Sequence, residues 1–415
     1  MAATMQRSQD LEFAHVLGSG GRRTNQLLKL SLSDVRNHVL LVGGSGSGKT
    51  HFTKALLEEI LLKGIPIVAI DSQGDLLWLT QPTSGRSPSK KKLSKLQKRV
   101  FTPNSAIGAP FVIAPVLSSV HSEINLQLIG YWIRSVLRTI GYDLKPGQTS
   151  PQEYQLTEVS KRIFSARGDL SLNGLFKAAS EEALAWTTDK MAPIRPEDAW
   201  ELVSRLGALL GNSKSLYKGK GFDIGKLTKS PRGGLWIIYS AHLAIETRQL
   251  VLNWVCDSVY HWMMSQRSRR HKNSPNLILF IDEAADYVTE SNRFEHRQSL
   301  FRLLNQGRKY GVGLVLAVQT PRALAPEVLN NCAIKIFGAV DDPGDLQSVT
   351  YSTGLLEREL TPIKNRSWKH AFVVRVPGAG DAFFCRARNL LTQKGEPIRL
   401  DSSRMISILK LLKQV

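Results

Sequence analysis

Cysteine is scarce in this chain: Cys256, Cys332 and Cys385 are its only three, and they lie far apart. An odd number of distant cysteines argues against a disulfide framework, and because no Cys-x-x-Cys pair occurs, no zinc site is expected either. Long apolar runs are missing too, so no segment reaches membrane-spanning length. The polar first ten residues contain no apolar signal-peptide core. We therefore expect a protein of the reducing cytoplasm with no membrane partner.

Acidic residues are few compared with basic ones. The 415 residues include 35 Asp and Glu against 55 Lys and Arg, which gives a formal net charge of +20. A chain this basic usually meets a polyanion, and nucleic acid is the first candidate. A soluble basic protein without such a partner, or one that meets an anionic membrane surface, would have the same composition. The hydrophobic content of 42% is enough for a large α/β core with an inserted subdomain.

A glycine-rich stretch between an apolar strand and a helix dominates the N-terminal third. Residues 37–42 predict the strand, and the sequence from Gly43 to Thr50 matches the P-loop pattern without a mismatch. Glycines let backbone N–H groups surround a phosphate, and the next helix directs its positive end to the same place. A flexible Gly/Ser linker is the alternative, but the flanking strand and helix disfavour it. The expected nucleotide-binding residues here are Gly43, Ser45, Gly46, Ser47, Gly48, Lys49, Thr50 and His51.

Within this P-loop two side chains have distinct expected tasks. Lys49 should reach the β- and γ-phosphates of ATP, and the Thr50 hydroxyl should ligate Mg²⁺. A second buried strand, predicted over residues 65–70, ends at Asp71. An acid at the carboxyl end of a strand beside a P-loop lies where ligands bind in open α/β sheets, so Asp71 is a candidate nucleotide-binding residue. A turn-forming role for Asp71 is the equal alternative.

The second half of the expected site follows another apolar strand, predicted over residues 276–281. Asp282 and Glu283 come directly after it, which is a Walker B pattern. Asp282 should hold Mg²⁺ together with Thr50, and Glu283 should activate the attacking water as general base. Two surface acids after a strand are the alternative. Two acids behind a long apolar run, downstream of an intact P-loop, make that alternative weaker.

Two further polar residues flank the strand predicted over residues 312–318. Gln319 ends this strand, where its amide can reach a γ-phosphate or the attacking water; the alternative is a turn or cap residue. Arg308 precedes the strand. It could complete a neighbouring subunit's site as an arginine finger, or it could be an ordinary surface base. We count Glu283, Arg308 and Gln319 as candidate catalytic residues.

The order of these motifs resembles the HerA–FtsK branch of P-loop ATPases, and most of all HerA-type ATPases. The resemblance is carried by residues 38–50, 71–75, 279–284 and 307–321, of which the Arg-Lys-Tyr-Gly-Val-Gly-Leu run at 308–314 is the most discriminating. It implies an α/β fold with a RecA-like core around a mostly parallel sheet. It also implies a hexameric ring around duplex DNA, ATP hydrolysis that drives translocation, Arg308 acting in trans, and a nuclease or defence effector as partner.

The expected organisation has four parts. Residues 1–34 should form a tail and a short β-hairpin, with strands at 13–17 and 27–32. Residues 35–120 and 230–390 should form the ATPase core, 121–229 a mainly helical insertion, and 391–415 a C-terminal helix. Residues 84–99 hold seven basic residues and no acid, which predicts a flexible basic loop that could contact phosphates or could simply be solvated.

The resemblance has one clear departure, because HerA proteins commonly carry an N-terminal β-barrel that 34 residues cannot form in full. The usual surface for a nuclease is therefore in doubt. Two alternative functions remain open at this stage. One is an ATP-binding ring scaffold that assembles an effector with little motor activity, and the other is a soluble secretion or conjugation ATPase.

Overall fold

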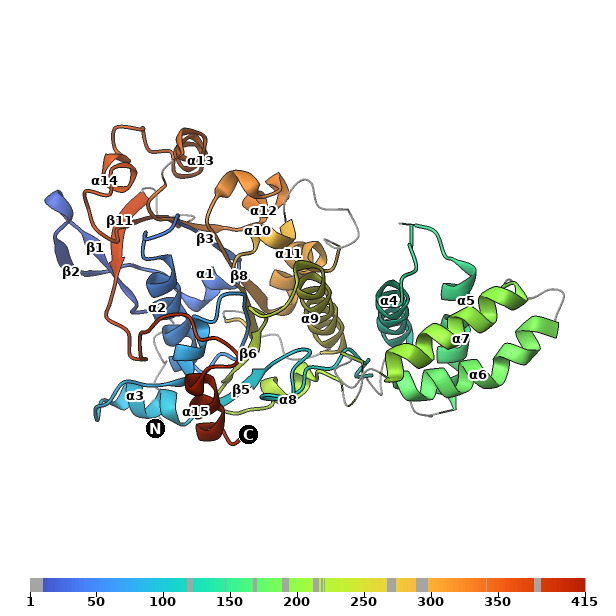
Figure 1. Cartoon of the computed structure of the whole chain (residues 1–415). Helices are drawn as coiled ribbons and strands as arrows, with labels where there is room; N and C mark the ends of the chain where they lie inside the picture. Colours follow the sequence, from blue (N-terminus) through green and yellow to red (C-terminus); the bar gives the residue numbers. More distant parts are fainter. Residues whose placement is uncertain are drawn as a thin grey trace, which may run out of the picture.

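The computed structural model describes residues 10–117, 122–145, 147–166, 170–188, 194–211, 216–217, 219, 221–266, 274–288, 298–340, 342–376 and 382–414. Within these ranges a single sheet of eleven strands runs through the molecule, in the spatial order β2-β1-β11-β10-β9-β3-β8-β7-β4-β6-β5. Figure 1 shows helices packed around this sheet and a group of helices that extends away from it.

The larger part of the sheet is parallel. Its strands, from β9 to β5 in the spatial order, all pair in the same direction. Every residue of β3, β4, β7 and β8 is buried. Continuous apolar strands of this kind are typical of parallel sheets that helices cover on both faces. The strands are β3 (Val39–Val42), β4 (Ile67–Asp71), β5 (Gln97–Phe101), β6 (Gly234–Tyr239), β7 (Leu277–Ile281), β8 (Val312–Val318) and β9 (Ile334–Phe337).

The other part of the sheet is antiparallel and brings the chain ends together. It comprises β1 (Ala14–Leu17), β2 (Arg23–Leu27), β10 (Phe372–Arg375) and β11 (Ala382–Ala387), and β11 lies between β10 and β1. The N-terminal hairpin is thus an extension of the main sheet. Its second strand was expected at 27–32, but β2 ends at Leu27. The chain then turns into the short helix α1 (Leu32–Val35), which Ser31 begins by forming a capping box with Asp34.

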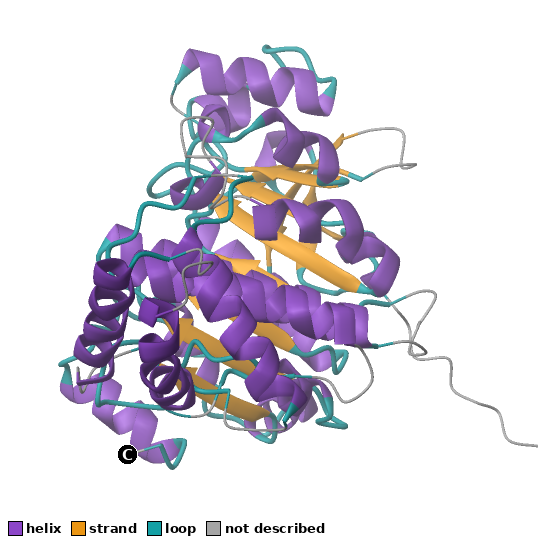
Figure 2. Cartoon of the chain, turned by 90° about the vertical axis from the view of Figure 1, so that its right-hand side faces the viewer, coloured by secondary structure: helices purple, strands orange, loops and turns teal. Residues whose placement is uncertain are grey.

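Two apolar layers cover the sheet. Along β3, Val39 and Leu41 belong to one layer and Leu40 and Val42 to the other, as the alternation of a strand requires. The first layer contains α2 (Lys49–Leu62) and the C-terminal helix α15 (Ser403–Leu411). The second contains α9 (Ile245–Ser265) and α11 (Gln298–Tyr310). Figure 2 shows the strands enclosed between helices.

Between β5 and β6 the chain forms five helices in succession. They are α4 (Ser122–Thr139), α5 (Pro151–Ser165), α6 (Leu172–Thr188), α7 (Pro196–Gly211) and α8 (Ile224–Thr228). Helix α4 packs on α9, whereas α5, α6 and α7 pack mainly on one another and on α4. In Figure 1 these three helices stand clear of the sheet.

The basic segment 84–99 is not the flexible loop that its composition suggested. It forms helix α3 (Pro88–Ser94) and most of β5. Ser87 caps the helix by accepting the N–H of Lys90, and Pro88 occupies the first helical position, where its missing N–H costs nothing. Leu93 and Leu96 are buried in the layer that contains α2. The remaining short helices are α10 (Ala285–Val288), α12 (Pro326–Asn331), α13 (Pro343–Thr353) and α14 (Thr361–Lys364).

Candidate nucleotide-binding site

The expected site residues other than Arg308 are brought together at one edge of the parallel sheet. Strands β3, β8, β7 and β4 are consecutive neighbours, and their carboxyl ends align: Val42 pairs with Val318, and Ile70 pairs with Ile281. The P-loop follows β3, Gln319 follows β8, and the acid pair follows β7. Because parallel strands present their carboxyl ends at the same edge, chain segments far apart in sequence meet there.

The P-loop has the shape of an anion cradle. Gly46 and Gly48 have φ values of +73° and +90°, which side chains other than glycine rarely adopt. Gly48 is also the N-cap of α2 and has no side chain with which to cap the first amides of this helix. The first amide bonded along the helix is that of Phe52, which donates to Gly48. The positive end of α2 therefore faces the loop.

The other expected P-loop residues divide by exposure. Ser45 and Gly46 are exposed at the tip, whereas Ser47 is buried and its Oγ accepts the N–H of Lys49 at 3.3 Å. The ring of His51 is turned away from the loop, because its Nε2 lies 2.8 Å from the carbonyl oxygen of Arg388. His51 can thus offer its backbone N–H group to a phosphate, whereas the N–H of Ser47 already donates to the carbonyl oxygen of Gly44 at 3.2 Å.

The catalytic candidates of the two motifs touch each other. Lys49 Nζ lies 3.5 Å from Glu283 Oε2, and Gln319 Nε2 donates to the same oxygen at 2.9 Å. All three side chains thus meet beside the P-loop, at the carboxyl ends of β3, β7 and β8. Glu283 adopts a φ of +52°, an uncommon conformation for a residue with a side chain. Strain of this kind concentrates at functional sites.

Asp282 lies beside Glu283 in a crowded anionic environment. Burial, reinforced by the charge of Asp71, raises the pKa of Asp282 to about 7. Ser72 Oγ lies 3.5 Å from its Oδ2. A carboxylate that is desolvated next to another acid gains from a nearby cation, which suits a metal ligand.

Asp71 itself has the turn-forming role that sequence analysis left as the alternative. Its carboxyl group is fully buried and accepts the N–H groups of Gln73, Gly74 and Leu76, at 3.4, 2.7 and 3.1 Å. Both oxygens are therefore used within the turn after β4. The turn accounts for the burial of this carboxyl group, and a contact between Asp71 and nucleotide stays a prediction. Asp71 influences the site through its charge, as the pKa of Asp282 indicates.

Arg308 lies far from the P-loop of its own chain. It ends α11 just before β8 begins, whereas the P-loop lies beyond the opposite end of the neighbouring strand β3. Seven residues of β8 separate the two edges of the sheet by about 20 Å. The arrangement rules out a contact between Arg308 and a nucleotide in the same subunit's site.

Two residues that sequence analysis missed contact the P-loop from outside. Arg366 Nη1 donates to the carbonyl oxygen of Ser45 at 3.1 Å, and His370 Nδ1 lies 3.4 Å from that of Ser47. The His370 ring packs so closely on Gly48 that an added Cβ there would meet it at 2.8 Å. These contacts join residues more than 320 positions apart. No local sequence pattern predicts these contacts.

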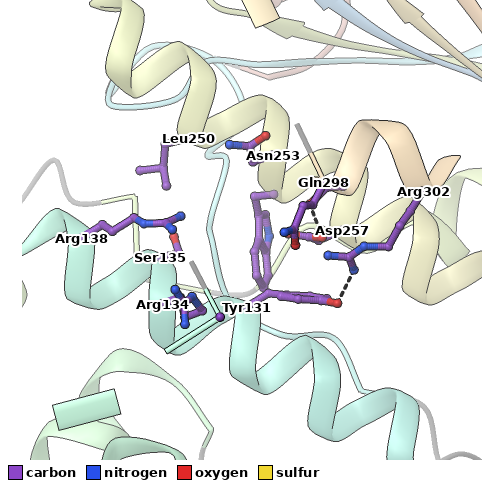
Figure 3. Close-up of a pocket in the computed structure, with 12 residues that line it drawn as sticks. Tyr131, Arg134, Ser135, Arg138, Leu250, Asn253, Asp257, Gln298 and Arg302 are labelled. Atoms are coloured by element: carbon purple, nitrogen blue, oxygen red, sulfur yellow. Dashed lines mark hydrogen bonds between the residues drawn. The ribbon is translucent and has the colours of Figure 1, made fainter. Parts of the chain in front are cut away.

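A separate polar cavity of about 320 Å³ lies between α4, α9 and α11. Figure 3 shows Arg134 and Arg138 on one side of it and Asn253, Gln298 and Arg302 on the other. Arg134 forms a bidentate contact with Glu153, and Arg302 donates to the hydroxyl of Tyr131. These contacts hold α4 against α11 and α5. None of the expected site residues lines this cavity.

The sequence comparison decides the family. A family model described as the central domain of the helicase HerA matches residues 16–258, more than half of the chain. The chain belongs to the HerA family. The resemblance expected from the sequence is thereby confirmed.

Two curated HerA relatives match most of this chain at low identity. The DNA double-strand break repair helicase HerA of Sulfolobus acidocaldarius is 19% identical over 365 residues, covering 85% of this chain and 66% of the relative. That of Saccharolobus solfataricus is 20% identical over 343 residues, covering 81% and 61%. This HerA-family chain thus spans about two thirds of the length of these relatives, or less.

Solved structures with the same fold include two at a TM-score of 0.59. The plasmid coupling protein TrwB in complex with ADP and Mg²⁺ is 16% identical, and the match covers 94% of this chain and 96% of the TrwB chain. VirB4 of Thermoanaerobacter pseudethanolicus is 14% identical, with coverages of 92% and 97%. These likenesses confirm the expected α/β fold with a RecA-like core. Within the described ranges, no helix combines the length and apolar character that crossing a membrane requires.

Proposed function

We propose that this chain is an ATP-hydrolysing subunit of a HerA-type motor that moves on double-stranded DNA. The observation that carries the proposal is the convergence of Lys49, Glu283 and Gln319 at one edge of the sheet, next to the P-loop and the start of α2. Lysine, glutamate and glutamine in this arrangement suit the hydrolysis of a nucleoside triphosphate. Membership of the HerA family supports the same activity.

The roles follow from the geometry. Backbone N–H groups of the P-loop and of the start of α2, among them those of Gly48, Thr50 and His51, bind the β- and α-phosphates, and Lys49 leaves Glu283 for the β- and γ-phosphates when ATP enters. Glu283 is then released to accept a proton from the attacking water, which Gln319 helps to orient. Arg366 and His370 hold the P-loop carbonyls from outside and so keep its N–H groups directed inwards.

The oxygen donors of the site suit Mg²⁺. In nucleotide sites this ion takes one or two protein ligands and completes its shell with phosphates and water. Thr50 and Asp282 would hold it here. Bound there, it would neutralise charge that develops on the phosphate oxygens. Consistent with so few protein ligands, the described residues contain no group of three or more His, Cys, Asp or Glu able to bind a metal alone.

The assembly is part of the proposal. Arg308 cannot reach the site of its own subunit, so a catalytic role for it requires a neighbouring subunit, as in a ring. We propose a hexamer. The net charge of +20 supports DNA as the polymer that the ring meets. Both named relatives are double-strand break repair helicases. That description supports a role in DNA processing, and we propose in addition a nuclease or defence effector as partner, as the family resemblance implies.

Steady-state ATPase activity, measured with and without duplex DNA, tests the proposal. We expect MgATP hydrolysis that duplex DNA stimulates, because a translocase couples turnover to its track. A chain that binds ATP but shows no hydrolysis in either condition would be the ring scaffold considered above. A chain that hydrolyses ATP at a rate independent of DNA would contradict the motor function alone.

A further inference from the structure

The basic segment 84–99 remains without a role in the proposed site. It contains seven basic residues and no acid: Arg86, Lys90, Lys91, Lys92, Lys95, Lys98 and Arg99. Because Leu93 and Leu96 anchor α3 in the apolar layer beside α2, the polar side of this helix faces outwards. The segment is thus a defined surface, whose cations can be considered one at a time.

Four of the seven cations have partners within the chain. Lys92 donates to the carbonyl oxygen of Leu62, at the C-terminal end of α2. Lys90 donates to the carbonyl of Ser84 at 2.8 Å and Lys98 to that of Thr80 at 2.9 Å. Burial lowers the pKa of Lys98 to about 8. Arg99 lies over the ring of Phe101. Structural roles account for these four.

The other three, Arg86, Lys91 and Lys95, are exposed, and we call them the α3 cations. Their side chains have no hydrogen-bond or ion-pair partner among the residues that the structure describes. Lys91 and Lys95 are one helical turn apart and repel each other. The helix dipole favours a cation near the end of α3, but it gives no reason for Arg86, which precedes the helix.

The C-terminal part of the chain lies close to the basic segment. Helix α15 lies beside α3 in Figure 1, and Gln414, just after it, accepts the N–H of Val100 on the strand that follows α3. Lys410 and Lys413 of this C-terminal part are exposed. The C-terminal part of the chain, which carries these two lysines, therefore reaches the strand that follows α3.

We propose that the α3 cations bind the phosphate backbone of duplex DNA. The proposal rests on the function above in one respect, that DNA is the polymer this chain meets. Lysine and arginine on an exposed convex helix suit phosphate contacts, which position a protein on DNA without reading its sequence. The contact should therefore be sequence-independent and strongly salt-dependent.

The test is the salt dependence of duplex binding, measured by fluorescence anisotropy with a labelled duplex of mixed sequence. The test variant combines Arg86→Gln, Lys91→Gln and Lys95→Gln. The control combines Arg22→Gln, Arg23→Gln and Lys29→Gln, which removes the same charge from exposed positions of the N-terminal hairpin and the segment after it. We expect the slope of log K against log salt to shrink by about 0.9 for each lost contact, or about 2.7 for three, in the test variant alone.

Several outcomes separate the possibilities. A Lys91→Arg/Lys95→Arg variant should keep the wild-type slope, because charge is what the contact needs; its failure would contradict the proposal. Equal losses in the test and control variants would show that only net charge matters and would overturn it. A test variant that loses binding to anionic lipid vesicles, while its binding to duplex DNA is unchanged, would also overturn the proposal. If the wild-type protein does not bind duplex DNA even at low salt, the result contradicts the proposed function itself, independently of the α3 cations.

Discussion

Glu283 shows how this site is built at the scale of one residue. Its φ of +52° costs a residue with a side chain roughly 1–2 kcal/mol. The neighbouring peptides explain why the conformation persists: the N–H of Asp282 donates to Ile70, and that of Ala284 donates to Ala317. Because the residues on both sides of Glu283 are hydrogen-bonded to two strands, its backbone is held in this conformation. The motif predicts a carboxylate at this position, but only the sheet dictates its direction.

A second residue links the core to the edge that carries Arg308. The buried ring of His38 accepts the N–H of Leu314 at Nδ1, at 3.0 Å, so its Nε2 carries the proton and donates to the carbonyl of Leu304. Burial lowers the pKa of His38 to about 4, although the Leu304 contact opposes this. Protonation would remove the acceptor that Leu314 uses. His38 must therefore stay neutral for these contacts to hold.

We predict that this histidine makes the fold acid-sensitive. Its contribution to the free energy of unfolding is complete above pH 6.5, the pKa of histidine in the unfolded chain, and falls as the pH decreases towards 4. The shift between these values corresponds to about 3 kcal/mol. Thermal unfolding midpoints of the wild type and a His38→Ala variant, compared between pH 7.5 and 4, check it. A gap between the two proteins that narrows with acid is expected, whereas a constant gap would show that His38 does not carry the effect.

At the scale of elements, the segment that follows β11 holds α2 in place. Arg388, just after β11, pairs with Glu58 and Glu59 of α2 at 2.7 and 3.1 Å. The fully buried Glu58 also accepts the N–H groups of Leu391 and Thr392 and the Thr392 hydroxyl. The helix that begins at the P-loop is thus clamped by the C-terminal segment. This is why residues 388–392 matter to the nucleotide site.

Replacing Arg388 by methionine should destabilise the protein by about 3 kcal/mol, because it leaves buried carboxylates without their cation. Arg399→Met is the matched control: this arginine is exposed in the same C-terminal segment, so its loss should cost no more than about 0.5 kcal/mol. Thermal unfolding of the two variants measures the difference. Equal midpoints would mean that the hydrogen bonds to Glu58 suffice without Arg388.

Elements also show what could be predicted from the sequence. Strands β3, β7 and β8 are continuous apolar runs, and their polar ends carry the motif residues, so periodicity and motif together predict them. Helix α3 was missed because its lysines dominate the composition. The Ser87-Pro88 start and the buried Leu93 were signals that could have found it. Asp71 could not be assigned, because a turn former and a ligand have the same sequence context.

At the scale of the whole molecule, the sheet separates two functional edges. The P-loop, Glu283 and Gln319 lie at the carboxyl edge, and Arg308 lies at the amino edge. Contacts such as those of Arg366 and His370 with the P-loop depend on the antiparallel strands joining the same sheet. No local pattern can predict them. In the proposed ring, one subunit would supply the P-loop that holds the phosphates and the next subunit would supply Arg308.

Mixing experiments test this division. Arg308→Ala and Lys49→Ala subunits should each be inactive alone, because one lacks the arginine and the other lacks the cradle. Mixed rings contain some sites with an intact cradle beside an intact Arg308, so ATPase activity should partly return. Normal turnover by Arg308→Ala alone would show that this arginine is an ordinary surface base.

The central claim is that the P-loop holds ATP and that Glu283 activates the water that cleaves it. A single-turnover assay that follows both bound ATP and released phosphate tests it most directly, with the variants Lys49→Ala and Glu283→Gln. The account predicts that Lys49→Ala loses ATP binding. It predicts that Glu283→Gln binds ATP like the wild type but releases phosphate at least about 100-fold more slowly. Phosphate release by Glu283→Gln at the wild-type rate would contradict it.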